Sequence, residues 1–580
     1  MRLLGVMIRL ALFFLSSFGY WQFLRKKTKV DLYFLPALTV ASQITLLFFA
    51  GLFNCLRIGA VFLWALGIVL AVISLVKDKW NGLKCYVNCG YLFLAAAVLL
   101  IAAAVKGALF THYDNFSHWA LVVKNMLDTN RFPNFQDYLI TFQSYPLGSA
   151  AYIYYFCRLV SDSESMQMLA QGYMMLSFLL PLFRFVKGNR GWNTLFLALL
   201  TNFLLCFNMG ISQLLVDTLL PLAGMAALVF LYCECLHKQD AGEENVPVYW
   251  AIPFLCAVMQ IKNSSIFFAA IGVGMILLSM RREKKDRRTV LTKLAVCASP
   301  FAVLILWQRH CGYVFVRANT TKHAMTLRNL GGTFLSKSLE DMKQILLKLA
   351  SFTFRGKAVT AAVVFLVVLG LVTLLTARSR KKVFAKFAAA GAVLYLAYMV
   401  GMALMYLCSM PLREALTLAG FGRYRATVLI AVYYLLAICV LQTISAMQVR
   451  KTRILAAAAM VCVLTGVWNV SCGGFVTIFQ KETSADRTWL SEAVAAYGVP
   501  EKSSYVYCIP AEDAGFTYFM GKYVLLSDNI SVKVVTDKEQ LDDAQNAAYL
   551  LIRDAENPII QEWVQEHYPD QAGEQVVVLQ

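Results

Sequence analysis

The feature that most constrains this chain is the recurrence of apolar blocks of about 20 residues, the length that an α-helix needs to cross the hydrocarbon core of a bilayer. Of 580 residues, 59% are hydrophobic and only 15% are charged. Charges gather in short runs between the blocks, as in RKKTK at 25–29 and RREKKDRR at 281–288. The pattern predicts an all-α polytopic membrane protein. We expect it to be a multi-pass protein of the cell membrane, with the lipid bilayer as a partner.

We expect about 13 to 14 transmembrane helices. The first block lacks a small-residue cleavage site and is expected to stay as a helix. The expected spans are roughly 3–23, 32–54, 58–76, 88–110, 165–187, 191–208, 213–234, 248–262, 264–281, 290–308, 357–377, 385–408, 424–446 and 453–471.

The basic runs predict the orientation, because short loops rich in Lys and Arg stay on the cytoplasmic side. All of these basic runs fall on the same side of the membrane if each apolar block crosses it once. Counting the apolar stretch 145–160 as another span would move the run at 281–288 outside, so we interpret it as an interfacial or re-entrant helix started by Pro146. The long loops 110–164 and 309–356 are then extracytoplasmic.

The tail differs in composition from the rest of the chain. Residues 481–580 hold 17 acidic and 7 basic residues, although the whole chain carries a formal charge of +19. The basic charge therefore belongs to the loops between spans, and nucleic acid is not an expected partner. Short strand-like runs alternate with helical segments in the tail. We predict a transmembrane domain at 1–475 and a small extracytoplasmic α/β domain at 476–580.

A carboxylate lies between two imidazoles where the chain leaves the fourth block, in THYDNFSHW at 111–119. Asp114 stands between His112 and His118, and four of the six histidines lie in the two long loops. One interpretation is that Asp114 caps the helix that follows it. Another is a divalent ion on His112, Asp114 and His118, but no clear fourth ligand is present, so we expect no metal and no other cofactor.

Three features of the first long loop together resemble the GT-C superfamily of integral membrane glycosyltransferases. They are an Asp just past a helix end, an amphipathic helix after it, and the proline-led start SYPLG at 144–148. The resemblance implies chemistry at the extracytoplasmic surface, a sugar donor linked to polyprenyl phosphate or diphosphate, and Asp114 as the catalytic carboxylate. Asn115 stands where family members commonly carry a second acid, which argues against a metal-dependent version.

Glycosyl transfer to a hydroxyl requires a base that takes the proton, and an aspartate at the membrane edge suits this role. His112 or His118 could tune Asp114 or relay the proton, since His118 lies four residues on and shares a helical face with it.

A lipid phosphate leaving group requires fixed cations. The candidates are Arg423 and Arg425, in GRYR at the start of the thirteenth span, and Arg317 and Lys322 in the second long loop. The alternative for these side chains is that they anchor helix ends at the interface.

Two ionisable residues, Asp217 and Lys262, interrupt apolar stretches, where charges are costly and commonly mark a site. They could form an ion pair that lines a cavity, or simply lie at the interface.

These observations predict a membrane glycosyltransferase that moves a sugar from a polyprenyl-linked phosphate donor to a cell-envelope glycan or polymer, with Asp114 as general base. One alternative is an O-antigen-type polymerase or ligase, in which Arg and His of the outer loops do the chemistry. Another is a non-enzymatic transporter of lipid or polysaccharide, which the lack of repeated halves disfavours.

Overall fold

The computed structural model describes residues 2–78, 81–188, 190–208, 210–238, 243–281, 286–315 and 327–580. The chain forms two compact units. The first, which we call the helical unit, comprises Met1–Gly107, Asn130–Phe132 and Gln143–Gln480. The second, the sheet unit, comprises Ala108–Thr129, Pro133–Phe142 and Lys481–Gln580. The loop predicted at 110–164 is thus divided between the two units, although the sequence placed all of it with the transmembrane domain.

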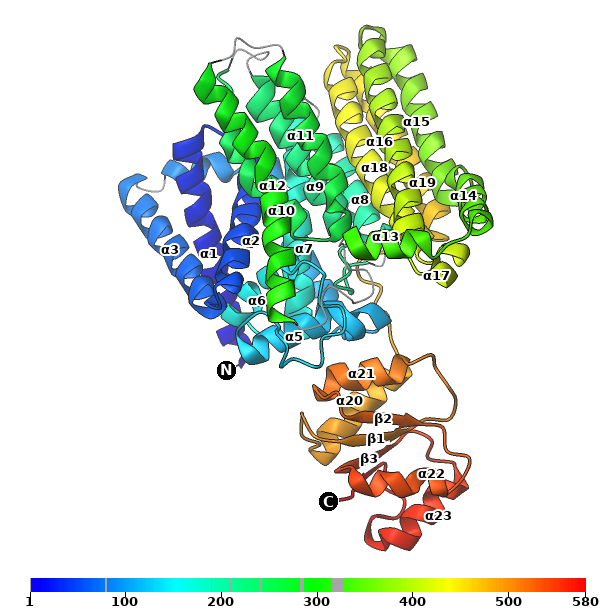
Figure 1. The fold of residues 1–580 in the computed structure, drawn as a ribbon. Coiled ribbons are helices and arrows are strands. Elements are labelled where there is room, and N and C mark those ends of the chain that lie inside the picture. Colours follow the sequence, from blue (N-terminus) through cyan, green and yellow to red (C-terminus); the bar gives the residue numbers. More distant parts are fainter. Residues whose placement is uncertain are drawn as a thin grey trace. The chain divides into compact units, whose positions relative to one another are not determined.

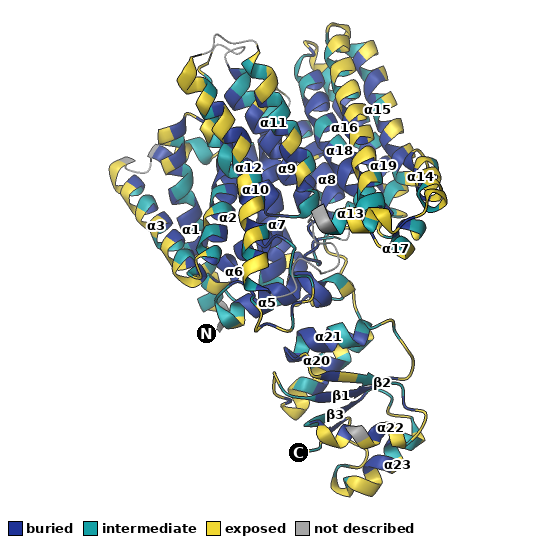
Figure 2. Ribbon diagram, in the orientation of Figure 1, coloured by how far each residue is buried: buried dark blue, intermediate teal, exposed yellow. Residues whose placement is uncertain are grey.

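Eleven helical segments among the described residues are long and apolar enough to cross a membrane, so the chain is a multi-pass membrane protein (Figure 1). Helices α7, α9 and α18 are buried along most of their length, whereas α3, α12 and α16 expose many apolar side chains (Figure 2). The helices in these segments are α1 (Arg2–Thr28), α2 (Leu35–Leu52), α3 (Leu56–Asp78), α7 (Glu164–Leu179), α9 (Leu219–Phe230), α11 (Ile266–Met280), α12 (Arg287–Val314), α15 (Lys357–Thr376), α16 (Lys381–Cys408), α18 (Phe421–Ser445) and α19 (Arg450–Cys472).

The predicted count of 13 to 14 spans is higher than the eleven found. The three remaining predicted segments, 88–110, 191–208 and 248–262, are helical but are not among the eleven. They correspond to α4 (Cys89–Val105), α8 (Arg190–Phe207) and α10 (Ile252–Met259). A helix rises only about 1.5 Å per residue, so α10 in particular is far shorter than the hydrocarbon core.

The stretch 145–160 contains α6 (Gly148–Leu159), which has 12 residues and is about 18 Å long. This length is too short for a crossing, in agreement with its exclusion from the predicted spans. The helix begins at Gly148 rather than at Pro146. The N–H of Gly148 donates to the Gln260 carbonyl at 2.8 Å, and a Cβ on residue 148 would lie only 2.5 Å from that of Gln260. Glycine is therefore required for this close approach.

Shorter elements complete the helical unit. They are α13 (Leu327–Leu335), α14 (Leu339–Thr353) and α17 (Leu412–Thr417), the π-turn η5 (Leu231–Leu236), and the 3-10 turns η1 (Leu32–Phe34), η2 (Asn81–Tyr86), η4 (Leu180–Phe185), η7 (Val248–Ala251), η8 (Asn263–Ser265) and η10 (Arg378–Arg380).

The sheet unit contains the small C-terminal α/β fold that the tail predicts. Its four strands have the order β2-β1-β3-β4, with β1 parallel to β2 and β3, and β4 antiparallel to β3. Val506 and Cys508 of β1 face a core with Trp563. The strands are β1 (Tyr505–Cys508), β2 (Ile530–Lys533), β3 (Tyr549–Ile552) and β4 (Val576–Val578); the helices are α20 (Ala485–Tyr497), α21 (Phe516–Leu525), α22 (Glu539–Asp542), α23 (Pro558–His567) and the 3-10 turns η11 (Asp543–Asn546) and η12 (Pro569–Gln571).

The segment that follows α4 packs against α21 of the sheet unit. It contains the π-turn η3 (Asn115–Trp119) and α5 (Ala120–Thr129). The ring of Phe116 lies 5.7 Å from that of Phe516. The Lys124 ammonium donates to Glu501 at 2.7 Å and to the Tyr523 carbonyl at 3.0 Å. Aromatic packing and the hydrogen bonds of the Lys124 ammonium therefore hold together two regions of the sheet unit that lie almost 400 residues apart in the sequence.

Candidate functional site

The predicted catalytic carboxylate stands at the start of η3, in the sheet unit. The backbone N–H of Asp114 donates to Nδ1 of His112 at 3.1 Å, which requires the tautomer with the proton on Nε2. The Asp114 side chain is half-buried and makes no capping hydrogen bond to η3. The turn itself is a π-helix, a conformation that often occurs at functional sites. Helix capping therefore does not account for Asp114.

His118 lies in a different environment from Asp114. Its side chain is buried, and its ring meets Trp119 and Phe142 edge-on, with ring centres 4.7 and 5.9 Å away. Burial lowers the pKa of His118 to about 3. The imidazole is therefore neutral at physiological pH and a weak base, and these contacts favour packing over the proton relay that we considered for it. His112 contacts the Asp114 backbone directly and is better suited to orient that residue.

A second cluster lies in the helical unit, where Lys262 and Arg423 flank Asp217. The Lys262 ammonium is 2.7 Å from one carboxylate oxygen of Asp217, and Nε of Arg423 is 3.5 Å from the other. The Asp217 side chain is only 4% exposed, against 26% for Arg423. The ion pair between Asp217 and Lys262, which the sequence left open, is thus present.

The three charged residues of this cluster lie near the ends of three different helices. Asp217 precedes α9, and its carbonyl accepts a hydrogen bond from the Thr427 hydroxyl of α18 at 3.2 Å. Lys262 has extended backbone, with φ −159° and ψ 152°, where the chain leaves α10. Arg423 is the third residue of α18. Each charged residue thus lies at a helix end, where the backbone can turn it towards the other two.

Lys262 also lines a cavity of about 460 Å³. Its ammonium lies 4.9 Å from the ring centre of Tyr424, another wall residue. Among the described residues, two cations thus pair with one carboxylate next to the cavity. The described lining residues are Tyr145, Lys262, Asn263, Ser264, Ile266, Phe267, Leu330, Tyr398, Gly401, Met402, Leu404, Met405, Cys408, Ser409, Met410 and Tyr424.

The SYPLG segment contributes to the same cavity. Tyr145 is one of its wall residues, and the Ser144 carbonyl accepts a hydrogen bond from the Trp307 indole at 3.0 Å. Gly148, at the end of the segment, fits against Gln260 two residues before Lys262. The motif that the sequence singled out therefore lies at the cavity and beside the turn that carries Lys262.

The other predicted phosphate ligands have different positions. Arg425 donates to the carbonyls of Phe352 and Arg355, at 3.0 and 2.6 Å, and lies over the Phe421 ring. These contacts satisfy carbonyls at the end of α14, as a cation at a helix C-terminus commonly does. Arg317 and Lys322 lie outside the described residues.

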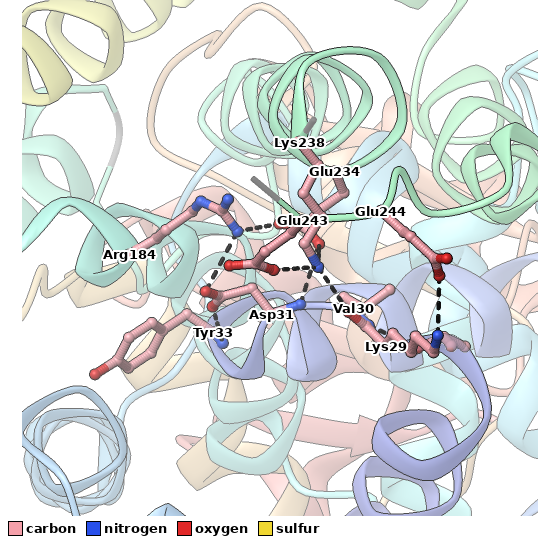
Figure 3. Close-up of polar contacts among 10 residues, drawn as sticks. Lys29, Val30, Asp31, Tyr33, Arg184, Glu234, Lys238, Glu243 and Glu244 are labelled. Carbon is pink, nitrogen blue, oxygen red and sulfur yellow. Dashed lines mark hydrogen bonds and ion pairs between the residues drawn. The ribbon is translucent and has the colours of Figure 1, made fainter. Parts of the chain in front are cut away.

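A third charged cluster was not expected from the sequence. Glu234, on the π-turn η5, is completely buried and pairs with Arg184 and Lys238 (Figure 3). Arg184 also lies 3.3 Å from Asp31, and the Asp31 N–H donates to Glu234 at 3.2 Å. The only signal in the sequence is the four-residue spacing of Glu234 and Lys238, which places both on one helical face.

Among the residues that the structure describes, no three His, Cys, Asp or Glu side chains form a group that could hold a metal ion. Comparison with protein-family models, curated proteins and solved structures gives no match to this chain. The class of protein is therefore defined by the eleven apolar helices among the described residues.

Proposed function

We propose that this protein is a membrane glycosyltransferase of the GT-C type, which transfers a sugar from a polyprenyl-linked phosphate to a cell-envelope glycan or polymer on the extracytoplasmic side. The observation that carries the proposal is the cavity beside Lys262. Its described wall is mostly apolar, and Lys262 is the one charged residue among the described lining residues. A hydrocarbon chain that ends in a phosphate matches this distribution of apolar surface and charge.

The charge balance supports an anionic ligand. Lys262 and Arg423 both pair with Asp217, so two cations gather at one carboxylate beside the cavity. An ionised group in a poorly hydrated site is costly unless it is paired, so a phosphate next to Lys262 would stabilise the cluster. Arg423 adds a planar guanidinium, which is suited to phosphate oxygens.

Asp114 would act as the general base. It takes the proton of the acceptor hydroxyl while the hydroxyl oxygen forms a bond to the anomeric carbon of the sugar. The bond between that carbon and the phosphate oxygen breaks, and the polyprenyl phosphate leaves with the electron pair.

The test compares the wild type with Asp114→Asn in a purified, reconstituted protein supplied with a radiolabelled polyprenyl-phosphate sugar and envelope acceptor. Asparagine keeps the size of the side chain but cannot take the proton. The transfer rate is expected to fall by about 10² to 10⁴, with donor affinity retained. Asp128→Asn is the matched control, since Asp128 lies in the same segment and pairs with Lys502 at 2.7 Å.

Near-native transfer by Asp114→Asn would remove the proposed base. Consumption of only a diphosphate-linked oligosaccharide would instead favour a polymerase or ligase, and movement of the lipid without bond cleavage would favour a transporter. Glycan profiles of envelopes from cells with and without this protein would identify the product.

A further inference from the structure

Helix α14 has an apolar surface that the rest of the described chain does not cover. Ile345, Leu349 and Thr353 recur every four residues and are buried against the helical unit. Beside them on the helix, Leu339 is 85% exposed, Leu347 is 61% exposed, and Leu346 is also exposed. At about 100° per residue, these three leucines form one stripe adjacent to the buried face, and the exposed Phe354 follows directly after the helix.

The opposite side of α14 is polar. It carries Glu340, Gln344 and Lys348, and the Lys348 ammonium donates to the Leu416 carbonyl at 2.8 Å. The helix starts in a capping box, in which Ser338 and Asp341 exchange hydrogen bonds of 3.0 and 3.1 Å. The helix is therefore well defined, with a packed face, an exposed apolar stripe and a polar face.

The position of α14 is fixed close to the end of a membrane span. Only three residues separate Thr353 from α15, which is one of the eleven apolar helices. Three residues can bridge no more than about 14 Å. Gly356 makes the turn with φ +109°, and a Cβ there would lie 3.0 Å from the Arg425 guanidinium. The α14 helix therefore lies within a short distance of the level where α15 enters the bilayer.

The contacts of α14 hold it at that end of the bundle. Arg425, near the start of α18, bonds the Phe352 and Arg355 carbonyls, and the Tyr395 hydroxyl of α16 bonds the Thr353 carbonyl. Figure 2 shows the exposed residues of α14 at this end, beside α15. The helix is thus attached to three neighbouring spans but presents its stripe away from them.

We propose that α14 lies in the plane of the membrane interface, with Leu339, Leu346, Leu347 and Phe354 inserted among the acyl chains of a phospholipid monolayer. An exposed apolar stripe that directly precedes a span is suited to lipid and costly in water. Lys343 lies within the stripe, and Arg355 and Lys357 follow it, so cations stand at the level of the head groups. An anionic phospholipid is the ligand that this arrangement fits.

The test places a photoreactive benzoylphenylalanine at Leu347 or, as the matched control, at Gln344 on the polar face. The full chain is reconstituted into vesicles of phosphatidylcholine and phosphatidylglycerol with tritiated acyl chains. After irradiation, the Leu347 variant is expected to carry several times more lipid label than the Gln344 variant. A third variant at Leu339 should behave like the Leu347 variant, since it lies on the same stripe.

Equal labelling at Leu347 and Gln344 would overturn the proposal. Crosslinking of the Leu347 variant to another protein chain in place of lipid would also overturn it, since the stripe would then be a protein interface. Leu347 and Gln344 are both exposed, so the fold is expected to tolerate the changes, and unchanged thermal unfolding of each variant verifies this.

Discussion

The helical unit contains two buried carboxylates that each sit between two cations, Asp217 and Glu234. Asp217 has Lys262 and Arg423, and Glu234 has Arg184 and Lys238. Both carboxylate side chains are almost completely buried, at 4% and 0% exposed. Their composition is the same, but their surroundings differ.

Around Glu234, the cations have further protein partners. Arg184 also pairs with Asp31, and Lys238 pairs with Glu243 at 3.2 Å and donates to the Lys29 carbonyl at 2.8 Å. Three carboxylates therefore face two cations. Around Asp217, two cations pair with one carboxylate, and Lys262 also lines a cavity. The comparison indicates that Glu234 joins neighbouring segments of the fold, whereas the Asp217 cluster borders a cavity.

Removing the buried charge should have the largest effect on stability. Glu234→Gln keeps the shape of the side chain but removes the buried carboxylate that joins Arg184 to Lys238, so among the described residues Arg184 keeps only Asp31 and Lys238 keeps only the exposed Glu243 as acidic partners. We expect the free energy of unfolding to fall by on the order of 3 kcal/mol, with unchanged affinity for a lipid-linked phosphate. Thermal unfolding of the full chain in detergent micelles measures the first, and equilibrium binding of a radiolabelled polyprenyl phosphate measures the second.

Glu244→Gln is the control for this prediction. Glu244 pairs with Lys29 at 3.0 Å, but both side chains are about four-fifths exposed. Exposed pairs contribute about 0 to 1 kcal/mol, so this variant should unfold almost like the wild type. If Glu234→Gln behaved like Glu244→Gln, the structural role of the Glu234 cluster would be contradicted.

The two clusters also differ in how well the sequence predicts them. Asp217 and Lys262 interrupt apolar blocks, where a charge is unusual, and so they could be singled out. Glu234 lies at the end of a block, where charges are common in any membrane protein. Its partners Asp31 and Arg184 are about 200 and 50 residues away, and the π-turn that positions it leaves no clear pattern in the sequence. Contacts of this kind follow from packing, which periodicity does not reveal.

The same limit applies to Asp114 and its neighbours. The apolar blocks and the alternation in the tail predicted most helices and all four strands, because both depend on local periodicity. That the segment 108–129 packs with the tail depends on contacts such as Phe116 on Phe516, between residues 400 apart. His118 and Asp114 have a helical spacing, but only the fold shows that one is buried and the other half-exposed.

Lys262→Met tests the ligand side of the comparison. The substitution removes the cation that lines the cavity while Arg423 still neutralises Asp217. We expect the dissociation constant for a polyprenyl phosphate to rise about 10- to 100-fold, which corresponds to the loss of a charged hydrogen bond of about 1.5 to 3 kcal/mol. Lys262→Arg, which keeps the charge, should recover part of the affinity. Equal affinity of the wild type and Lys262→Met would show that the phosphate does not bind in this cavity.

The smallest effect is expected for Arg425→Gln, compared with Arg423→Gln two residues earlier on the same helix. Arg425 is occupied by the carbonyls at the end of α14, so its replacement should cost about 1 kcal/mol of stability and leave donor affinity unchanged. Arg423→Gln should weaken donor binding, because its guanidinium belongs to the Asp217 cluster. The sequence alone made both arginines candidate phosphate ligands, with anchoring of helix ends as the alternative. Equal losses of donor affinity in the two variants would favour phosphate binding by both and contradict the anchoring role of Arg425.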